Sequence, residues 1–316
     1  MSDTTAPTRS WLPAFFGIAL MWGTSFLFIK VAVAELHPAW LAFGRIALGA
    51  LTLGAMLAVL RQRLPGDRRL WLHLFVLGFV ANTVPFTLFA YAEQRVSSIV
   101  AGIWNGTAPL TTLAVTLVAM PSERPTHSRV AGLLLGFVGV LVVLGAWRSG
   151  GASLSGQLML LGAVSCYGVA FNHIRWITRR WDTSGVTLSF GQLGMSALQL
   201  AVIAPLVAGS PPAPGSLSAG VVWSMVALGI LGSGLAFVLQ YRVVRLAGMT
   251  TASTVTYVVP VFAAIAGVVV LGEHLAWNQP VGGLIVLAGV AVSQGLVVSR
   301  LDDWRSRRAA RLSARC

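Results

Sequence analysis

The stretch FGRIALGALTL at residues 43–53 recurs as FGQLGMSALQL at residues 190–200, with five identical positions. Further pairs continue the match at a nearly constant separation: Pro109 with Pro260, Tyr91 with Tyr241, and Glu123 with Glu273. Self-similarity over such a distance indicates an internal duplication. We therefore expect a chain built from two similar halves.

The composition predicts that both halves lie in a membrane. Of the 316 residues, 56% are hydrophobic and 10% are charged, whereas about 25% of the residues in a typical soluble domain are charged. The mean hydropathy is +0.80. The 34 glycines fit the same class, because helices in lipid pack closely through small residues. The sequence predicts an all-α polytopic membrane protein.

Ten apolar runs are long enough to cross a bilayer, whose hydrocarbon core of about 30 Å needs roughly 20 residues of helix. Turn-forming segments such as RQRLPGDRRL at residues 61–70 separate them. The ten runs cover residues 13–33, 38–60, 71–92, 96–119, 129–147, 157–177, 185–208, 218–241, 250–272 and 280–299. The first run ends in a sequence like a cleavage site, but the weakly charged segment before it is not typical of a signal peptide, and we expect the run to be retained.

Five spans fall in each copy. The first copy covers residues 13–147 and the second 157–299, with a linker at 148–156 and tails at 1–12 and 300–316. Because five is odd, the second copy enters the membrane from the opposite side, and we expect two inverted five-helix repeats. Such repeats are typical of transporters that alternate access around a central site. Duplication without transport is the alternative.

The basic residues indicate the orientation. If the N-terminus is cytoplasmic, 18 of the 22 lysines and arginines fall on the inner side, including six in the C-terminal tail, and only Arg95 and Arg148 fall outside. Positive charge gathers in cytoplasmic loops, so we expect both termini in the cytoplasm and the protein in a bacterial inner membrane. The net charge of +13 is then topogenic. It does not indicate nucleic-acid binding, which needs a basic stripe on a soluble face.

The two cysteines, Cys166 and Cys316, form neither a disulfide framework nor a metal-binding spacing. A membrane-embedded enzyme needs a nucleophile with its base, catalytic carboxylates or a metal cluster, and the spans show none of these patterns. We expect no catalytic centre, metal or cofactor.

Polar residues within the spans mark the candidate site, because a polar group in hydrocarbon is costly unless it faces protein, a partner or water. They gather in spans 1, 3, 4, 6, 8 and 9, which we expect to line a central cavity. Spans 5 and 10 are aliphatic and glycine-rich, and we expect them at the periphery, packed through residues such as Gly132 and Gly136. The alternative is ordinary packing, since Ser, Thr and Asn also link helices. The candidate solute-binding residues are Trp22, Thr24, Ser25, Asn82, Thr83, Trp104, Asn105, Tyr167, Asn172, His173, Ser233, Thr256 and Tyr257.

Pro85, Pro109 and Pro260 lie inside the spans that carry the polar residues. Proline removes a backbone hydrogen bond and kinks a helix, and the freed carbonyl can face a cavity. Pro109 and Pro260 occupy matching positions in the two copies, so we expect these prolines to act as hinges.

Lys30 and Arg45 are the basic residues inside spans. Each can extend its charged end to water; alternatively, one of them attracts a solute carboxylate in the outer vestibule. No Asp or Glu lies deep in a span, since Glu93 and Glu273 stand at helix ends. His173 is the remaining group that titrates near neutral pH, although a structural role is more typical. We expect facilitated movement of the solute with weak or no ion coupling.

Several short motifs carry a family resemblance. MWGTSF at residues 21–26 with Lys30, Arg45 in the second span, the run LGEH at 271–274 and GGLIVLAGV at 282–290 together resemble EamA members of the drug/metabolite transporter superfamily. The first copy departs from the pattern with AMPSE at 119–123 in place of the usual Leu-Gly-Glu. The resemblance implies a fold of two inverted five-helix repeats around a central cavity, and export of amino acids or related metabolites.

The predicted function is export of a small molecule through the lipid bilayer by alternating access. A channel or a facilitative uniporter of other small solutes is the alternative, and a non-transport membrane protein is a further one. The protein is expected not to be an enzyme and not to bind nucleic acid, and a homodimer is a possible assembly. A small multidrug pump keeps an acidic residue in its first helix; residues 13–33 hold none.

Overall fold

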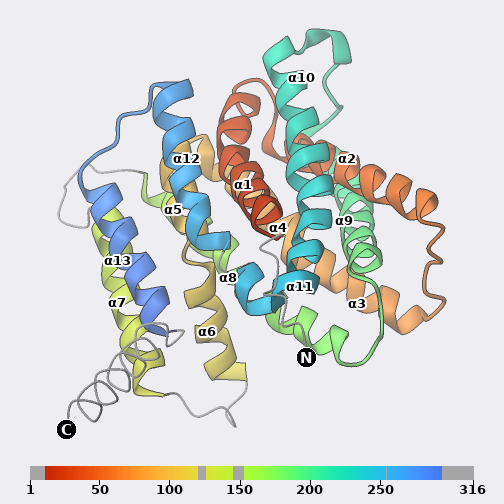
Figure 1. The fold of residues 1–316 in the computed structure, drawn as a ribbon. Coiled ribbons are helices and arrows are strands. Elements are labelled where there is room, and N and C mark those ends of the chain that lie inside the picture. The colour runs from red at the N-terminus through yellow and green to blue at the C-terminus, as the bar shows by residue number, and fades with distance from the viewer. Residues whose placement is uncertain (1–10, 120–125, 145–152, 254, 294–316) are drawn as a thin grey trace, which may run out of the picture.

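The computed structural model describes residues 11–119, 126–144, 153–253 and 255–293, and Figure 1 shows their arrangement. These residues form helices joined by short turns, with no strand among them. The first half contains α1 Leu12–Ala32, α2 Pro38–Val59, α3 Arg68–Gly78, the π-helix η1 Phe79–Thr83, α4 Val84–Glu93, α5 Ser98–Asn105, α6 Ala108–Ala119 and α7 His127–Leu144. The second half contains α8 Leu154–Thr178, α9 Gly185–Ala208, the 3-10 turn η2 Pro214–Ser216, α10 Ala219–Val226, the π-helix η3 Ala227–Leu235, α11 Ala236–Ser253, α12 Val255–Leu271 and α13 Asn278–Ser293.

The helices match the predicted spans. By length and composition, six helical segments can cross a membrane: Leu12–Ala32, Pro38–Val59, Arg68–Glu93, Leu154–Thr178, Gly185–Ala208 and Ala219–Ala247. Three shorter apolar helices cover the fifth, ninth and tenth predicted spans, and α5 with α6 covers the fourth. The chain is therefore an all-α polytopic membrane protein, as the sequence predicted.

One predicted boundary is wrong. We expected a loop between the eighth and ninth spans, around residues 242–249, but α11 continues through these residues to Ser253. The segment RVVRLAGM contains no proline and a single glycine, so no local signal ends the helix there.

Polar caps fix where several helices begin. The hydroxyls of Ser97, Ser153, Ser184 and Ser218 accept the backbone N–H three residues ahead, at the starts of α5, α8, α9 and α10. The carboxylate of Asp67 accepts the N–H of Arg69 at the start of α3. These side chains satisfy N–H groups that have no partner within the helix.

The two halves interlock, and the packing keeps the same pattern when the halves are exchanged. The first span (α1) packs against the ninth (α12), and the sixth (α8) packs against the fourth (α6). Likewise α2 packs against η3 of the eighth span, and α9 packs against α3 and η1 of the third. Two further pairs, α2 with α9 and α7 with α13, join equivalent helices. The same helix pairings thus occur from either half.

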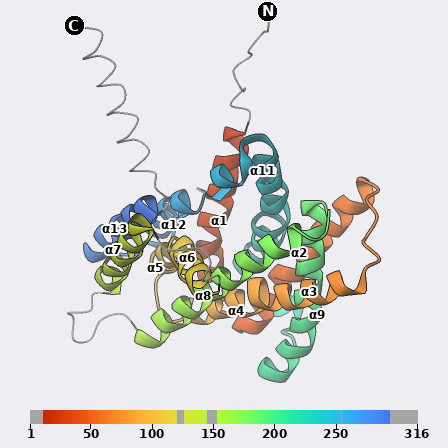
Figure 2. The ribbon, with the colours of Figure 1, turned by 90° about the horizontal axis from the view of Figure 1, so that it is seen from below.

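The α7–α13 pair lies at one side of the molecule in both Figure 1 and Figure 2. Its backbones approach closely at glycines: a Cβ at Gly289 would lie 2.5 Å from the backbone N of Gly136, and one at Gly139 would lie 2.6 Å from that of Val286. Close approach through small residues is how helices associate in lipid. It explains the glycines of spans 5 and 10, which carry few polar groups.

We predict that Gly289→Ala lowers the free energy of unfolding by about 1–3 kcal/mol, because the added methyl group overpacks the α7–α13 contact. Gly283→Ala on the same helix is the matched control, since its nearest neighbour would lie 3.7 Å away. Alanine raises helix stability over glycine by about 0.5–1 kcal/mol where there is room, so the control should melt at or above the wild-type temperature. Thermal unfolding in detergent measures both; equal melting temperatures for the two variants would contradict the prediction.

Candidate functional site

A buried arginine lies where the two halves meet. Arg45 of α2 is 7% exposed, and its Nε donates a hydrogen bond to Oγ of Ser233 in η3 at 3.1 Å. Its guanidinium lies 4.1 Å from the centre of the Phe86 ring. No carboxylate among the described residues forms an ion pair with it. The guanidinium therefore keeps further N–H groups that can bind an anion.

The π-helix η3 shapes this contact. A π-helix widens the turn of the backbone, and Nε1 of Trp22 donates to a carbonyl of this segment, that of Gly232, at 3.2 Å. A Cβ at 232 would lie 2.8 Å from Oγ of Ser25, so the hydroxyl of Ser25 would have to shift to admit a larger residue. Ser25 itself donates to the carbonyl of Met21 within α1. Three predicted residues, Trp22, Ser25 and Ser233, therefore gather around Arg45 and η3.

The other half has its own polar contact at the corresponding π-helix, η1. Thr83 donates to Oε1 of Gln199 at 2.7 Å, and Nε2 of Gln199 donates to the carbonyl of Phe75 at 2.8 Å. Asn82 is 2% exposed, and its Nδ2 has no partner among the described residues. The π-helices are a feature that sequence reasoning missed. Their signal is the interruption of an apolar span by glycine and small polar residues.

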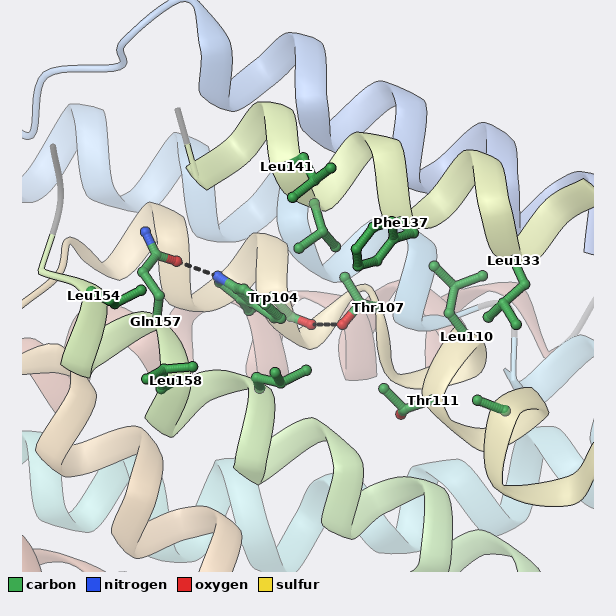
Figure 3. Close-up of a pocket in the computed structure, with 13 residues that line it drawn as sticks. Trp104, Thr107, Leu110, Thr111, Leu133, Phe137, Leu141, Leu154, Gln157 and Leu158 are labelled. Atoms are coloured by element: carbon green, nitrogen blue, oxygen red, sulfur yellow. Dashed lines mark hydrogen bonds between the residues drawn. The ribbon is translucent and has the colours of Figure 1, made fainter. Parts of the chain in front are cut away.

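A cavity of about 220 Å³ lies between the fourth, fifth and sixth spans. Figure 3 shows the side chains that line it. Nε1 of Trp104 donates to Oε1 of Gln157 at its edge, and the hydroxyl of Thr107 donates to the carbonyl of Trp104 at 2.7 Å. The rest of the wall is apolar. The lining residues are Trp104, Thr107, Leu110, Thr111, Ala114, Leu133, Phe137, Val140, Leu141, Leu154, Gln157, Leu158 and Leu161.

This cavity differs from the central one expected between spans 1, 3, 4, 6, 8 and 9. One wall is α7, the fifth span, and Trp104 is the predicted site residue that lines it. Sequence reasoning did not select Gln157, which lies at the start of a long apolar helix. The structure identifies this residue: Gln157 is 2% exposed and lies beside a tryptophan N–H that needs an acceptor.

Two predicted residues connect the sixth span to the first half. Tyr167 stacks on Phe89 with ring centres 6.2 Å apart. Asn172 donates to the carbonyl of Gly168 at 2.9 Å and accepts from Thr116 of α6 at 3.1 Å. Both contacts fix α8 against the first copy.

His173 lies away from Arg45, with Nε2 at 3.2 Å from Nδ1 of His73. Trp176 and Trp181 pack around the histidine pair, and the guanidinium of Arg180 lies 4.2 Å from the Trp176 ring centre. This cluster joins α3 to the end of α8. A structural role, the more typical one for a lone histidine in a span, fits the placement.

The remaining predicted residues occupy several helices. Thr24 donates to the carbonyl of Leu20, and Asn105 is the last residue of α5. Thr256 and Tyr257 lie on α12, where Tyr257 packs beside Val286 and Val290. These four residues do not gather with Arg45 in the contacts described.

The prolines occupy different helix positions in the two copies. Pro109 is the second residue of α6, directly after the break at residues 106–107 that divides the fourth span. Pro260 lies inside an unbroken α12, where its ring faces Gly106. Pro85 is the second residue of α4 and follows η1. The hinge role of all three stays a prediction.

Lys30 is partly buried and binds the backbone of the first half. Its Nζ donates to the backbone carbonyls of Glu93 and Val96, at 2.6 and 2.8 Å, and so satisfies the end of α4. Glu273, which follows α12, accepts N–H groups at the start of α5 and so joins the second copy to the first. Glu93 ends α4, as the sequence indicates, but it is fully buried.

The fold and these contacts define a multi-pass α-helical membrane protein in which two similar halves interlock through buried polar groups. Residues 9–145 and residues 154–294 each match the EamA-like transporter family. The chain therefore belongs to this family and is a membrane transporter, which confirms the resemblance carried by its motifs.

Relatives of similar length support the same class. The chain is 26% identical over 302 residues to the uncharacterized inner membrane transporter YedA of Escherichia coli (strain K12), covering 91% of this chain and 92% of that one. It is 23% identical over 275 residues to the uncharacterized transporter YoaV of Bacillus subtilis (strain 168), covering 86% and 92%. A solved crystal structure superposes with a TM-score of 0.66 at 21% identity, over 93% of this chain and 99% of that one. This last likeness shows the fold alone.

Outside the spans, one contact predicts a pH dependence. A hydrogen bond from Nε1 of Trp181 and another from the N–H of Arg69 hold the pKa of Asp67 below its ordinary value. A carboxyl whose pKa is lowered on folding stabilises the protein at neutral pH, and this contribution is lost as the pH falls through the folded-state pKa. The effect should be small, because Asp67 is exposed.

We predict that the melting temperature falls as the pH drops below about 4, and that Asp67→Asn weakens this dependence. Thermal unfolding across a pH series measures it. Asp182→Asn, next to Trp181 in the chain, is the control and should keep the wild-type profile. An unchanged profile in Asp67→Asn would show that the contact with Trp181 has no such role.

Proposed function

We propose that the protein exports small metabolites that carry a carboxylate, amino acids or related compounds, by alternating access. The observation that carries this proposal is the buried guanidinium of Arg45, which contacts Ser233 and Phe86; Glu93 acts on it electrostatically, but no carboxylate within the described part of the chain forms a direct ion pair with it. A buried charge is costly without a partner. A solute carboxylate would supply that partner during transport.

The position of Arg45 supports a transport role. It lies between α2 of the first copy and η3 of the second, so a solute bound there would contact both halves. In transporters built from repeats, solute sites lie at the repeat interface and often involve irregular helix segments. Trp22 adds an aromatic face beside η3, which suits a partly apolar solute.

Alternating access also fits the duplicated packing. We propose that residues 13–147 and 157–299 form inverted five-helix units that rock against each other. An odd number of spans in each copy, and contacts that keep their pattern when the copies are exchanged, support this arrangement. A channel is the second candidate, because polar contacts between the halves could also line a continuous path; saturable exchange separates a carrier from a channel.

The test is counterflow of labelled L-amino acids and aromatic metabolites with the purified protein in liposomes. We expect saturable exchange that prefers L-phenylalanine over L-phenylalaninamide, which lacks the carboxylate. Flux that rises linearly with solute concentration would favour a channel, and no exchange across the panel by folded protein would contradict the proposal.

In the same assay, Arg45→Gln should remove the preference for the acid over the amide. A hydrogen bond to a charged group contributes about 1.5–3 kcal/mol, so the half-saturating concentration of the acid should rise about ten- to a hundredfold. Arg95→Gln is the control, because Arg95 is exposed on the turn after α4. Thermal unfolding and gel filtration verify that both variants fold. An unchanged preference in Arg45→Gln would exclude Arg45 as the carboxylate site.

For orientation, we propose that both termini and the α2–α3 turn face the cytoplasm and that the α4–α5 turn faces outward. Single cysteines at Gln94 and at Gly66, both exposed, test this in a background without Cys166 and Cys316. A maleimide that cannot cross membranes should label Gln94→Cys in intact cells, and Gly66→Cys only after the cells are opened. The reverse pattern would contradict the proposed orientation.

A further inference from the structure

Glu93, the last residue of α4, is a buried carboxyl group that the transport model above does not use. It is 0% exposed, and neither Oε1 nor Oε2 has a hydrogen-bond partner among the described residues. An ionised carboxylate in such surroundings is costly unless a charge compensates it, and ionisable groups inside membranes are typically functional. The side chain therefore needs a reason to be there.

The charged groups that act on Glu93 come from three other elements: Lys30 of α1, Arg45 of α2 and Glu273 after α12. We refer to these four residues as the 30/45/93/273 cluster. The helix α8, which also packs on α4, adds Tyr167, whose phenol lies near Arg45. The cluster thus contains two cations and two carboxylates drawn from both halves of the chain.

Three members of the cluster have fixed hydrogen-bond partners. Lys30 donates to two backbone carbonyls, and Arg45 donates to Ser233. Glu273 accepts at Oε1 from the Ser98 N–H, at 2.8 Å, and at Oε2 from the Ser98 hydroxyl and the Ile99 N–H. Glu93 alone has a charged end that no hydrogen bond holds, so it is the member whose protonation state can change without breaking a contact.

A proton on Glu93 would change the charge balance at the repeat interface. With both carboxylates ionised, the two positive and two negative charges of the cluster cancel. When Glu93 is protonated, one positive charge is left uncompensated, and Arg45 is the cation with N–H groups still available. The protonation state of Glu93 is therefore linked to how strongly the interface attracts an anion.

Glu93 is also adjacent in the chain to exposed residues. The next two residues, Gln94 and Arg95, are exposed on the α4–α5 turn. A small displacement of this turn would connect the carboxyl group to one side of the membrane, while burial closes it off in the conformation described. A group that couples proton movement to transport must be reachable from one side at a time.

We propose that Glu93 binds and releases one proton in each transport cycle, so that movement of the solute is coupled to movement of protons. The proton adds to a carboxylate oxygen from water on one side and leaves from the same oxygen to water on the other side. This inference rests on the proposed transport function. It revises the expectation of weak or no ion coupling, which depended on Glu93 being at an ordinary helix end.

The first experiment uses the proton itself as the probe and needs no solute. Infrared difference spectra of the full chain in liposomes, between about pH 5 and about pH 8, detect the C=O stretch of protonated carboxyl groups. The wild-type spectrum should contain a component at the high frequency typical of a carboxyl group without hydrogen bonds. Glu93→Gln should lose this component, Glu93→Asp should retain a shifted form of it, and Glu35→Gln, an exposed carboxyl control, should keep the wild-type spectrum.

The second experiment adds an equimolar mixture of L-amino acids to proteoliposomes that contain a trapped pH-sensitive dye. The wild-type protein should change the lumen pH as solute enters. Glu93→Gln should lose this pH change and keep counterflow of the labelled amino acids, because exchange needs no net proton movement.

Two results would overturn the inference: a Glu93→Gln infrared spectrum identical to the wild type, or wild-type uptake of amino acids with no change in lumen pH. Each leaves the transport proposal intact, since counterflow is measured separately. Absence of wild-type counterflow would instead contradict the transport proposal, and the infrared comparison would still decide whether Glu93 titrates.

Discussion

The contact between Arg45 and η3 combines the main constraints on this structure. A guanidinium inside a membrane protein must find polar groups in the protein itself, because lipid offers none. Ser233 supplies one, and it comes from the other half of the chain. The close approach of α2 to η3 needs glycine, since a Cβ at Gly49 would lie 2.7 Å from that of Ser233. The hydrogen bond of the buried charge and the close packing of the helices thus occur at the same place, and together they hold the two halves in contact there.

The two copies use the same design with different residues. Gln192 stands in α9 where Arg45 stands in α2, and η1 is bound through Gln199 and Thr83 where η3 is bound through Arg45. The η1 contact is neutral, and Gln199 in it both donates and accepts a hydrogen bond. The η3 contact carries the charge of Arg45, which keeps further N–H groups for an anion. The two interfaces are therefore chemically distinct. This asymmetry is the reason we propose solute binding on the α2–η3 side.

The spans could be predicted from the sequence because apolar length is a strong and local signal. The predicted boundary between the eighth and ninth spans was wrong because no such signal marks it: no proline or glycine cluster interrupts α11. Of the candidate residues, Trp22, Ser25, Arg45 and Ser233 lie near one another in the structure, since polar residues at depth face protein; their role in solute binding stays a prediction. The burial of Glu93 and the pairing of Gln157 with Trp104 could not be predicted, because both depend on which helix packs against which.

The fourth span is broken at residues 106–107, between α5 and α6. Above the break, α5 is held to the second copy: Glu273 binds its first residues, and Gly106 lies against Pro260 of α12. Below it, α6 packs on α8, which also belongs to the second copy, and on α7. One span is therefore divided between two sets of partners, and residues 106–107 are the short segment that joins them. Relative motion of those sets would concentrate at this segment, since the unbroken helix around Pro260 keeps its partners on both sides. The turn that ends α4 and contains the neighbours of Glu93 lies on the α5 side of this break, so displacement of α5 would change the surroundings of that carboxyl group directly.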